Sequence, residues 1–101
     1  MTYGLTNDIW QQMNDVFQRN KAIQQVMLFG SRAMNTHHPG SDIDLALRGR
    51  LSFNALLEIA SQLDELDTLY AFDVLDERRI ANPALLNHIR QHGKVIYDAE
   101  Q

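Results

Sequence analysis

The sequence predicts an α/β protein in which helices and strands pack in two layers. Amphipathic helical patterns alternate along the chain with short apolar runs rich in Val, Ile, Leu and Phe, and this alternation is typical of such a fold. The 101 residues, of which 45% are hydrophobic, are enough for one compact domain with a core. We therefore treat residues 1–101 as a single domain without linkers or repeats.

The N-terminal third predicts a helix over residues 7–19 that Asn7 can cap. Its apolar side chains fall on one face at helical spacing: Ile9, Met13, Val16 and Phe17. A strand over 22–29 is expected next, and its last residues are apolar enough to be buried. Gly30-Ser31 ends this strand, and a short helix can begin at Ser31.

The central segment predicts a loop followed by a second strand. Residues 36–41 contain Pro39-Gly40, a strong turn signal, so we expect them to be a loop. Residues 42–47 alternate in polarity and predict a strand. Its apolar residues lie on the face opposite the aspartates: Ile43, Leu45 and Leu47.

The second half predicts four more elements. In order they are a helix over 53–67, a strand over 68–75, a helix that begins at Pro83 and ends just before Gly93, and a short strand over 94–97. Ser52 can cap the first of these helices. The second has Pro at its first position and Gly just past its end, as helix termini prefer.

The composition excludes several classes of function. The chain has no cysteine, so it forms neither a disulfide framework nor a thiolate zinc site. No apolar run approaches the roughly 20 residues that span a bilayer, and no signal peptide is recognisable. We therefore expect no membrane contact and a cytoplasmic location. The net charge of -4 disfavours direct nucleic-acid binding, which depends on Lys and Arg.

The most informative segment joins Gly30-Ser31, across ten residues, to Asp42-Ile43-Asp44. Two carboxylates spaced i, i+2 on a strand point to the same face, and Mg²⁺ is their natural counter-charge because it binds carboxylate and phosphate oxygens together. Asp73 lies within the later apolar strand. If the two strands are neighbours, three carboxylates converge, as a site for two metal ions requires.

Gly30, Ser31 and Arg32 are the candidate phosphate-binding residues. Glycine lets a polyphosphate approach the backbone closely, and backbone N–H groups that follow a strand suit a phosphate. Ser31 adds a hydroxyl donor. Arg32 is expected either to neutralise phosphate charge or to face solvent.

In this order and spacing, Gly30-Ser31, Asp42-x-Asp44 and Asp73 resemble the motifs of the minimal nucleotidyltransferases in the DNA polymerase beta superfamily. The resemblance implies a mixed β-sheet with helices packed on one side. It also implies catalysis with two Mg²⁺ ions, held by the three aspartates, and ATP as nucleotide donor. Asn35 stands where many members have glycine and tolerates a left-handed backbone. His38 replaces a basic residue.

Minimal members of this family are typically paired with a HEPN-domain toxin. The resemblance therefore implies an antitoxin that forms a heteromeric complex with the toxin and transfers AMP to one of its tyrosine hydroxyls. Three alternatives stay open: a non-catalytic, nucleotide-binding antitoxin that inhibits by complex formation, transfer to a small molecule, and a homodimer.

Other polar residues receive structural interpretations. We expect Asp76 to cap or turn the chain, and His37-His38 to lie in an exposed loop. His88 and His92 share one helical face that is expected to be solvated near a helix C-terminus. Trp10 belongs to the core or to a partner surface.

Overall fold

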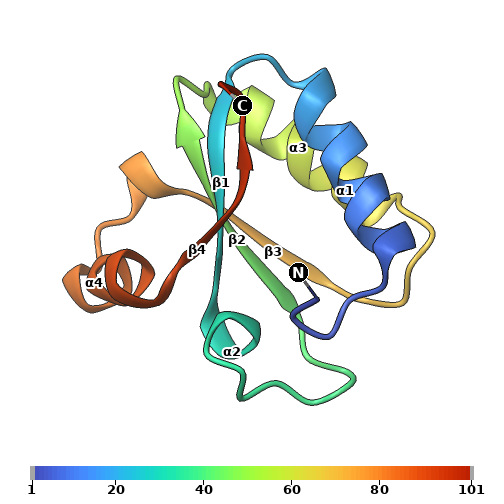
Figure 1. The fold of residues 1–101 in the computed structure, drawn as a ribbon. Helices are drawn as coiled ribbons and strands as arrows, with labels where there is room; N and C mark the ends of the chain where they lie inside the picture. The colour runs from blue at the N-terminus through green and yellow to red at the C-terminus, as the bar shows by residue number, and fades with distance from the viewer. Residues whose placement is uncertain (1, 101) are drawn as a thin grey trace.

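Four strands form one mixed sheet in the order β3-β2-β1-β4, as Figure 1 shows for the computed structural model, which describes residues 2–100. Their bounds are β1 Ile23–Phe29, β2 Ile43–Gly49, β3 Phe72–Asp76 and β4 Lys94–Asp98. β1 is antiparallel to both β2 and β4, whereas β2 and β3 are parallel. A parallel pair needs a long crossover, which one of the helices supplies.

Residues 2–100 also form four α-helices and one 3-10 helix, of which only the first precedes the sheet in sequence: α1 Asn7–Arg19, α2 Gly30–Ala33, α3 Phe53–Asp64, η1 Glu77–Arg79 and α4 Pro83–His92. α3 is the crossover between the parallel strands. Among residues 2–100, no helix is both long and apolar enough to cross a membrane.

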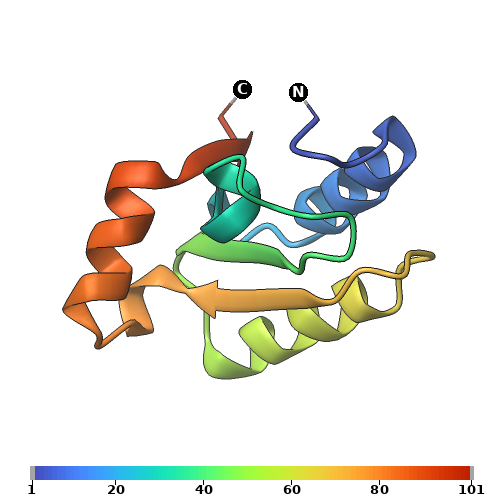
Figure 2. The same cartoon turned by 90° about the horizontal axis from the view of Figure 1, so that it is seen from below.

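The larger core lies between the sheet and the helices α1 and α3, which pack on the same side of it (Figures 1 and 2). Alternate residues of β2 point into this core because side chains alternate faces along a strand. The buried residues of the two strands and two helices include Val16, Phe17, Val26, Leu28, Ile43, Leu45, Leu47, Ile59 and Leu63.

A second, smaller core covers the other face of the sheet. Ile89 of α4 packs there with Met27, Phe29 and Ala46, all buried. The predicted mixed sheet with helices packed on it is confirmed, and α1 and α3 lie on one side as expected. α4 instead packs on the opposite side of the sheet. β1 ends in four consecutive buried residues, and such a strand needs cover on both faces.

Several termini follow from side-chain caps. Thr6, and not Asn7, caps α1, since its hydroxyl accepts a hydrogen bond from the amide of Ile9 at 3.3 Å. Ser52 and Asn82 cap α3 and α4 as predicted. Asp76 caps η1 and accepts from the amide of Arg78 at 3.0 Å, which confirms its structural interpretation.

α3 and β3 are shorter than the sequence predicted. α3 ends at Asp64 instead of residue 67, where the run of acidic residues is unfavourable beside the negative end of a helix. β3 begins at Phe72 instead of residue 68, because its partner β2 begins at Ile43 and the two residues are paired. The last strand runs one residue past its prediction, to Asp98.

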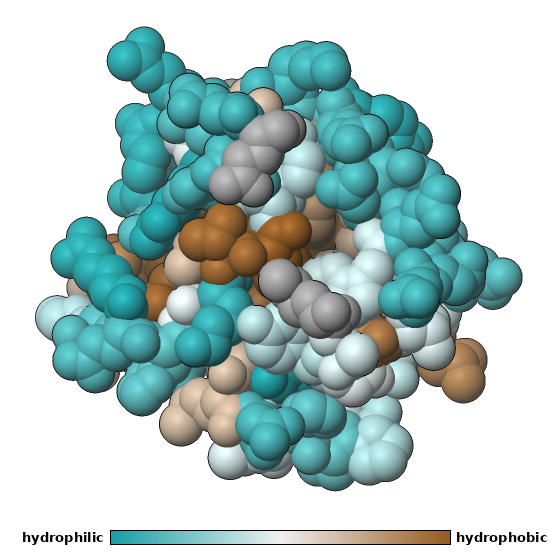
Figure 3. Space-filling view, viewed as in Figure 1, coloured by the Kyte–Doolittle hydropathy of each residue, from teal (hydrophilic) through white to brown (hydrophobic). Residues whose placement is uncertain are grey.

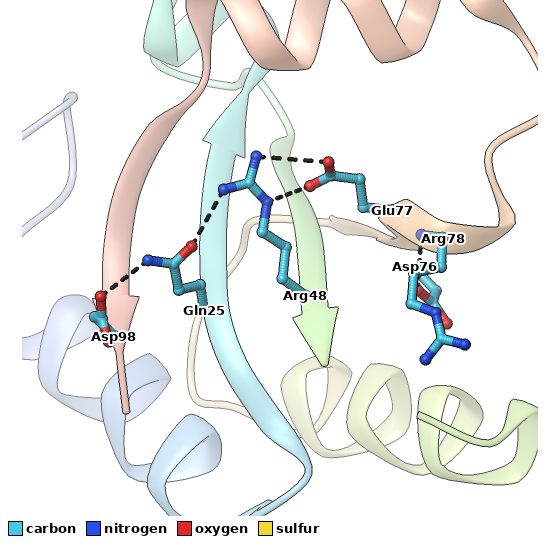
Figure 4. Close-up of polar contacts among 6 residues, drawn as sticks. All are labelled: Gln25, Arg48, Asp76, Glu77, Arg78 and Asp98. Carbon is cyan, nitrogen blue, oxygen red and sulfur yellow. Dashed lines mark hydrogen bonds and ion pairs between the residues drawn. The ribbon is translucent and has the colours of Figure 1, made fainter. Parts of the chain in front are cut away.

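A chain of polar contacts crosses the sheet near the end of β2 (Figure 4). Gln25 of β1 donates to Asp98 of β4 at 2.9 Å and accepts from Arg48 of β2 at 3.1 Å. Arg48 in turn forms an ion pair with Glu77 of η1. These side chains tie both edges of the sheet to its centre.

The surface seen in Figure 3 is mostly hydrophilic, with an apolar patch near its centre, where β4 crosses the view. Val95 of this edge strand is 44% exposed. Single exposed apolar residues are normal on soluble proteins.

Candidate active site

Asp44 of β2 and Asp73 of β3 are paired residues of the parallel strands. Paired residues on neighbouring strands carry their side chains on the same face. This is the face of Ala46, opposite the larger core. Asp42 precedes β2 by one residue. It lies two residues before Asp44, and residues two apart on extended backbone carry their side chains on the same face.

The other two carboxylates are close enough to Asp44 to influence its protonation. Burial, the largest cause, and the negative charges of Asp73 and Asp42 together raise the pKa of Asp44 from 3.8 to about 6, against a lowering effect of Arg32. Like charges disfavour ionisation of a neighbour. The raised pKa of Asp44 is the effect expected of a partly buried carboxylate with two like charges nearby.

Gly30 brings the turn after β1 against Asp44. Its φ of +74° lies in the left-handed region, which glycine adopts without steric cost. A Cβ atom at this position would lie 2.2 Å from Oδ2 of Asp44. The absence of a side chain thus permits both the turn and the close approach of the carboxylate.

Ser31 and Asn35 complete the segment that follows this turn. Ser31 is half-buried, and within residues 2–100 its hydroxyl makes no hydrogen bond, whereas its carbonyl accepts from the amide of Thr36 at 2.9 Å. Asn35 has a φ of +59°, so the expected left-handed backbone is confirmed. A free hydroxyl beside Gly30 and Asp44 suits a phosphate oxygen.

The alternative that Arg32 faces solvent is wrong, because groups of the protein enclose its guanidinium. The side chain is 1% exposed. It donates to the carbonyl of Ser41 from Nε at 3.3 Å and from Nη2 at 2.8 Å, and to the carbonyl of Tyr3 from Nη1 at 2.9 Å. It also lies over the ring of Tyr70, 4.7 Å from its centroid. Arg32 therefore holds the loop that carries Asp42 in place.

His88 joins the site although its sequence suggested a solvated helix face. Its Nε2 atom accepts a hydrogen bond of 3.1 Å from the amide of Gly30, and its ring meets the edge of Phe29. A phosphate oxygen that accepted from this amide would first displace the imidazole. No sequence signal distinguishes His88 from His92, since only the docking of α4 decides which of them reaches the turn.

The donor set fits the divalent cations that the resemblance implies. Aspartate oxygens are hard ligands suited to Mg²⁺, and Asp44, whose pKa is raised chiefly by burial, also feels the negative charges of Asp73 and Asp42. Within residues 2–100, however, no three His, Cys, Asp or Glu side chains form a group that could hold a metal ion. The carboxylates share a face without forming a closed cage.

His37 and His38 lie away from the carboxylates, on the loop before Asp42. His38 is exposed as expected, while His37 is half-buried beneath the N-terminal segment. A Cβ atom at Gly4 would lie 2.5 Å from Nε2 of His37. The two histidines therefore pack or line the surface around the site.

Comparisons with known proteins agree with this geometry. Residues 11–101 match the model of the family described as polymerase beta, nucleotidyltransferase. No protein of curated function matches the sequence.

Solved structures give a more detailed comparison. A chain from a toxin-antitoxin crystal structure with AMP-PNP is 29% identical, with a TM-score of 0.71 over 91% of this chain and 75% of that one. A chain from the toxin-antitoxin MntA-HepT is 25% identical, with a TM-score of 0.66 over 95% and 75%. A chain from a complex of tri-AMPylated Shewanella oneidensis HEPN toxin with MNT antitoxin is 26% identical, with a TM-score of 0.65 over 92% and 72%.

Proposed function

The chain belongs to the polymerase beta nucleotidyltransferase family, and on this premise we propose that it is an antitoxin that transfers AMP from ATP to a tyrosine hydroxyl of a HEPN-domain toxin. The observation that carries the proposal is the placement of Asp44, paired with Asp73 and in contact range of Gly30. This geometry supports a site in which carboxylates bind metal ions close to a turn that binds phosphate.

The structural neighbours support the choice of donor and acceptor. One of them was crystallised with AMP-PNP, an ATP analogue, as a toxin-antitoxin complex. Another contains a tri-AMPylated HEPN toxin bound to an MNT antitoxin. At 26 to 29% identity over more than nine tenths of this chain, the likeness supports the same partner class here.

In this proposal each residue has a defined task. Ser31 donates its hydroxyl to a phosphate oxygen, and Gly30 keeps the backbone open to the polyphosphate. Asp42, Asp44 and Asp73 would hold two Mg²⁺ ions, which when bound stabilise phosphate charge and lower the pKa of the attacking hydroxyl. Arg32 keeps Asp42 in register through Ser41.

The reaction forms one bond and breaks one. The tyrosine oxygen bonds to the α-phosphorus of ATP while the bond from that phosphorus to the bridging oxygen breaks. Pyrophosphate leaves, and the hydroxyl proton passes to solvent. An in-line arrangement of attacking and leaving oxygens is required, so the acceptor must enter from the side opposite pyrophosphate.

The test is transfer of label from α-³²P-ATP to a HEPN-domain toxin in the presence of Mg²⁺. We expect labelling of a tyrosine by the wild type and none by the Asp42→Asn/Asp44→Asn double variant. The Asp64→Asn/Asp67→Asn variant removes the same charge from the exposed end of α3 and the turn that follows it, and it serves as the matched control.

Three results would contradict the proposal. They are no transfer by the wild type, equal transfer by the Asp42→Asn/Asp44→Asn variant, and unchanged transfer after chelation of Mg²⁺ by EDTA. If the inactive double variant still neutralised the toxin, inhibition by complex formation would replace transfer as the mechanism.

A further inference from the structure

A basic cavity of about 1040 Å³ lies beside the loop after β2. Its charged lining consists of four arginines and a single acid: Arg48, Arg50, Arg78, Arg90 and Glu77. The whole chain has only nine Lys and Arg against thirteen Asp and Glu. Nearly half of its basic side chains therefore gather at one cavity of an acidic protein.

This cavity is separate from the candidate active site. Arg48 lies four residues after Asp44 on β2, which corresponds to roughly 13 Å along a strand. Between these two ends, α4 packs on the sheet through Ile89 against Ala46. None of the predicted active-site residues lines the cavity, so nucleotide binding does not account for it.

Two of the arginines are fixed by contacts within the protein. Arg48 is held between Gln25 and Glu77, as Figure 4 shows. Arg78 donates from Nη1 to the carbonyl of Gly49 at 3.2 Å. Side chains that are ordered before binding lose less conformational entropy when a partner arrives.

The other two arginines are available to a partner. Arg50 and Arg90 are exposed, and within the described part of the chain neither makes a hydrogen bond or an ion pair. Guanidinium groups bind carboxylates and phosphates in a bidentate manner. The cavity thus offers unused cationic donors for an anionic ligand.

An apolar stripe on α3 adjoins the cavity. α3 begins directly after Ser52, which lines the cavity. Phe53 and Leu57, one helical turn apart, are 56% and 53% exposed, and the guanidinium of Arg79 lies 5.8 Å from the centroid of the Phe53 ring. Arginine and aromatic residues together are enriched in protein interfaces.

These observations favour a protein ligand over a nucleic acid. Nucleic-acid binding depends on Lys and Arg neutralising many phosphates, whereas this cavity offers four arginines on a protein of net charge -4. Exposed Phe53 and Leu57 have no role in gripping a phosphate backbone. We propose that the basic cavity and the Phe53–Leu57 stripe form a docking surface for an acidic protein segment with flanking apolar residues.

This inference deepens the proposed function and rests on it in one respect, that the segment belongs to the acceptor toxin. Docking at this surface would hold the acceptor while its tyrosine reaches the carboxylates. The surface itself is testable without the acceptor, because its chemistry defines a simple probe.

The probe is a fluorescein-labelled peptide of six glutamates flanked by leucines, with binding followed by fluorescence anisotropy. We expect Arg50→Glu and Arg90→Glu each to weaken binding at least about tenfold, because truncated or reversed charges at interfaces have effects of this size. Arg19→Glu, an equal charge change on α1, is the matched control and should leave binding unchanged. A peptide with glutamine in place of glutamate should not bind.

Parallel measurements show whether each variant is otherwise intact. ATP affinity and the thermal midpoint should match the wild type in all three variants, and Arg50→Gln and Arg90→Gln should have intermediate effects. Equal weakening by Arg19→Glu would reveal only general charge attraction and overturn the proposal. So would failure of the wild type to bind the peptide, or binding of a 20-nucleotide RNA that outcompetes it.

Transfer kinetics with the HEPN protein as acceptor test the docking surface and the proposed function separately. If Arg50→Glu and Arg90→Glu impair transfer to the HEPN protein by raising its KM while kcat is kept, the docking surface is supported. If transfer is normal in both variants, the docking surface is wrong and the proposed function stands. If the wild type transfers nothing but binds the acidic peptide through these arginines, the docking surface stands and the proposed function is wrong.

Discussion

The Nε2 atom of His88 accepts a hydrogen bond of 3.1 Å from the backbone amide of Gly30, which ties α4 to the turn at the end of β1. This contact links two segments that are 58 residues apart in sequence. It also satisfies a half-buried amide that would otherwise need water or a ligand.

Replacement of His88 by Ala should lower the free energy of unfolding by about 1 kcal/mol, since it removes this hydrogen bond. The edge contact with Phe29 is lost as well. Urea denaturation measures the change. His92→Ala serves as control, because His92 contacts the His88 ring without a hydrogen bond to the turn. This variant should lower the free energy of unfolding clearly less than His88→Ala. Equal losses in the two variants would contradict the assigned role of the His88–Gly30 bond.

Gly30→Ala should abolish nucleotide transfer while costing only about 1–2 kcal/mol of stability, the usual penalty of a left-handed φ for other residues. The new Cβ would collide with Oδ2 of Asp44, so the carboxylate must rotate away. Activity and thermal unfolding measured on the same sample separate the two effects. Gly40→Ala is the control, since a Cβ there meets nothing closer than 3.8 Å. Full activity of Gly30→Ala would show that the Asp44 position is not required.

Asp44→Asn should make the protein more stable at neutral pH in the presence of EDTA. In the folded protein the pKa of Asp44 is about 6, above its ordinary value of 3.8, so the folded state binds the proton more tightly. The stability that this proton provides is fully present below pH 3.8 and is lost as the pH rises through 6.

The difference between Asp44→Asn and the wild type should therefore appear between pH 4 and 6 and level off near 1 kcal/mol, about a third of the unscreened value because the group is partly solvated. Thermal midpoints at a series of pH values measure it. Asp64→Asn, at an exposed carboxylate on α3, is the matched control for the loss of one negative charge. A constant difference between the two proteins across this range would refute the raised pKa.

Arg32→Lys should destabilise the protein by about 2 kcal/mol or more. Lysine keeps the charge but cannot reproduce the forked donation to Ser41 or the stacking on Tyr70, and buried carbonyls lose their donors. Transfer should fall as well, since the loop before Asp42 loosens. Arg19→Lys on exposed α1 is the matched control for urea unfolding. A fully stable and active Arg32→Lys protein would show that the buried clamp is dispensable.

The sequence predicted those features that depend on local periodicity. The alternation in residues 42–47 was enough to place Asp44 opposite Ile43 and Leu45, and the apolar surroundings of Asp73 were enough to prefer it over Asp76. Both features follow from the two-residue repeat of a strand. The pairing of Asp44 with Asp73 required only that the two strands be neighbours.

The features that the sequence left open depend on how distant elements dock. The sequence left open whether Arg32 faces solvent or binds phosphate, and only the fold shows that Ser41 and Tyr70 enclose it. His88 becomes part of the site only because α4 packs on the face of Met27 and Phe29. The consecutive apolar residues at the end of β1 did indicate that a second element covers this face of the sheet. A strand with one solvent-exposed face would instead alternate apolar and polar residues.

α4 carries His88 and Arg90 only two residues apart, about 3 Å along a helix axis and on nearly opposite sides of it. The first touches the turn beside the carboxylates, and the second lines the basic cavity. A partner that binds at Arg90 therefore contacts the same short helix whose His88 holds the amide of Gly30.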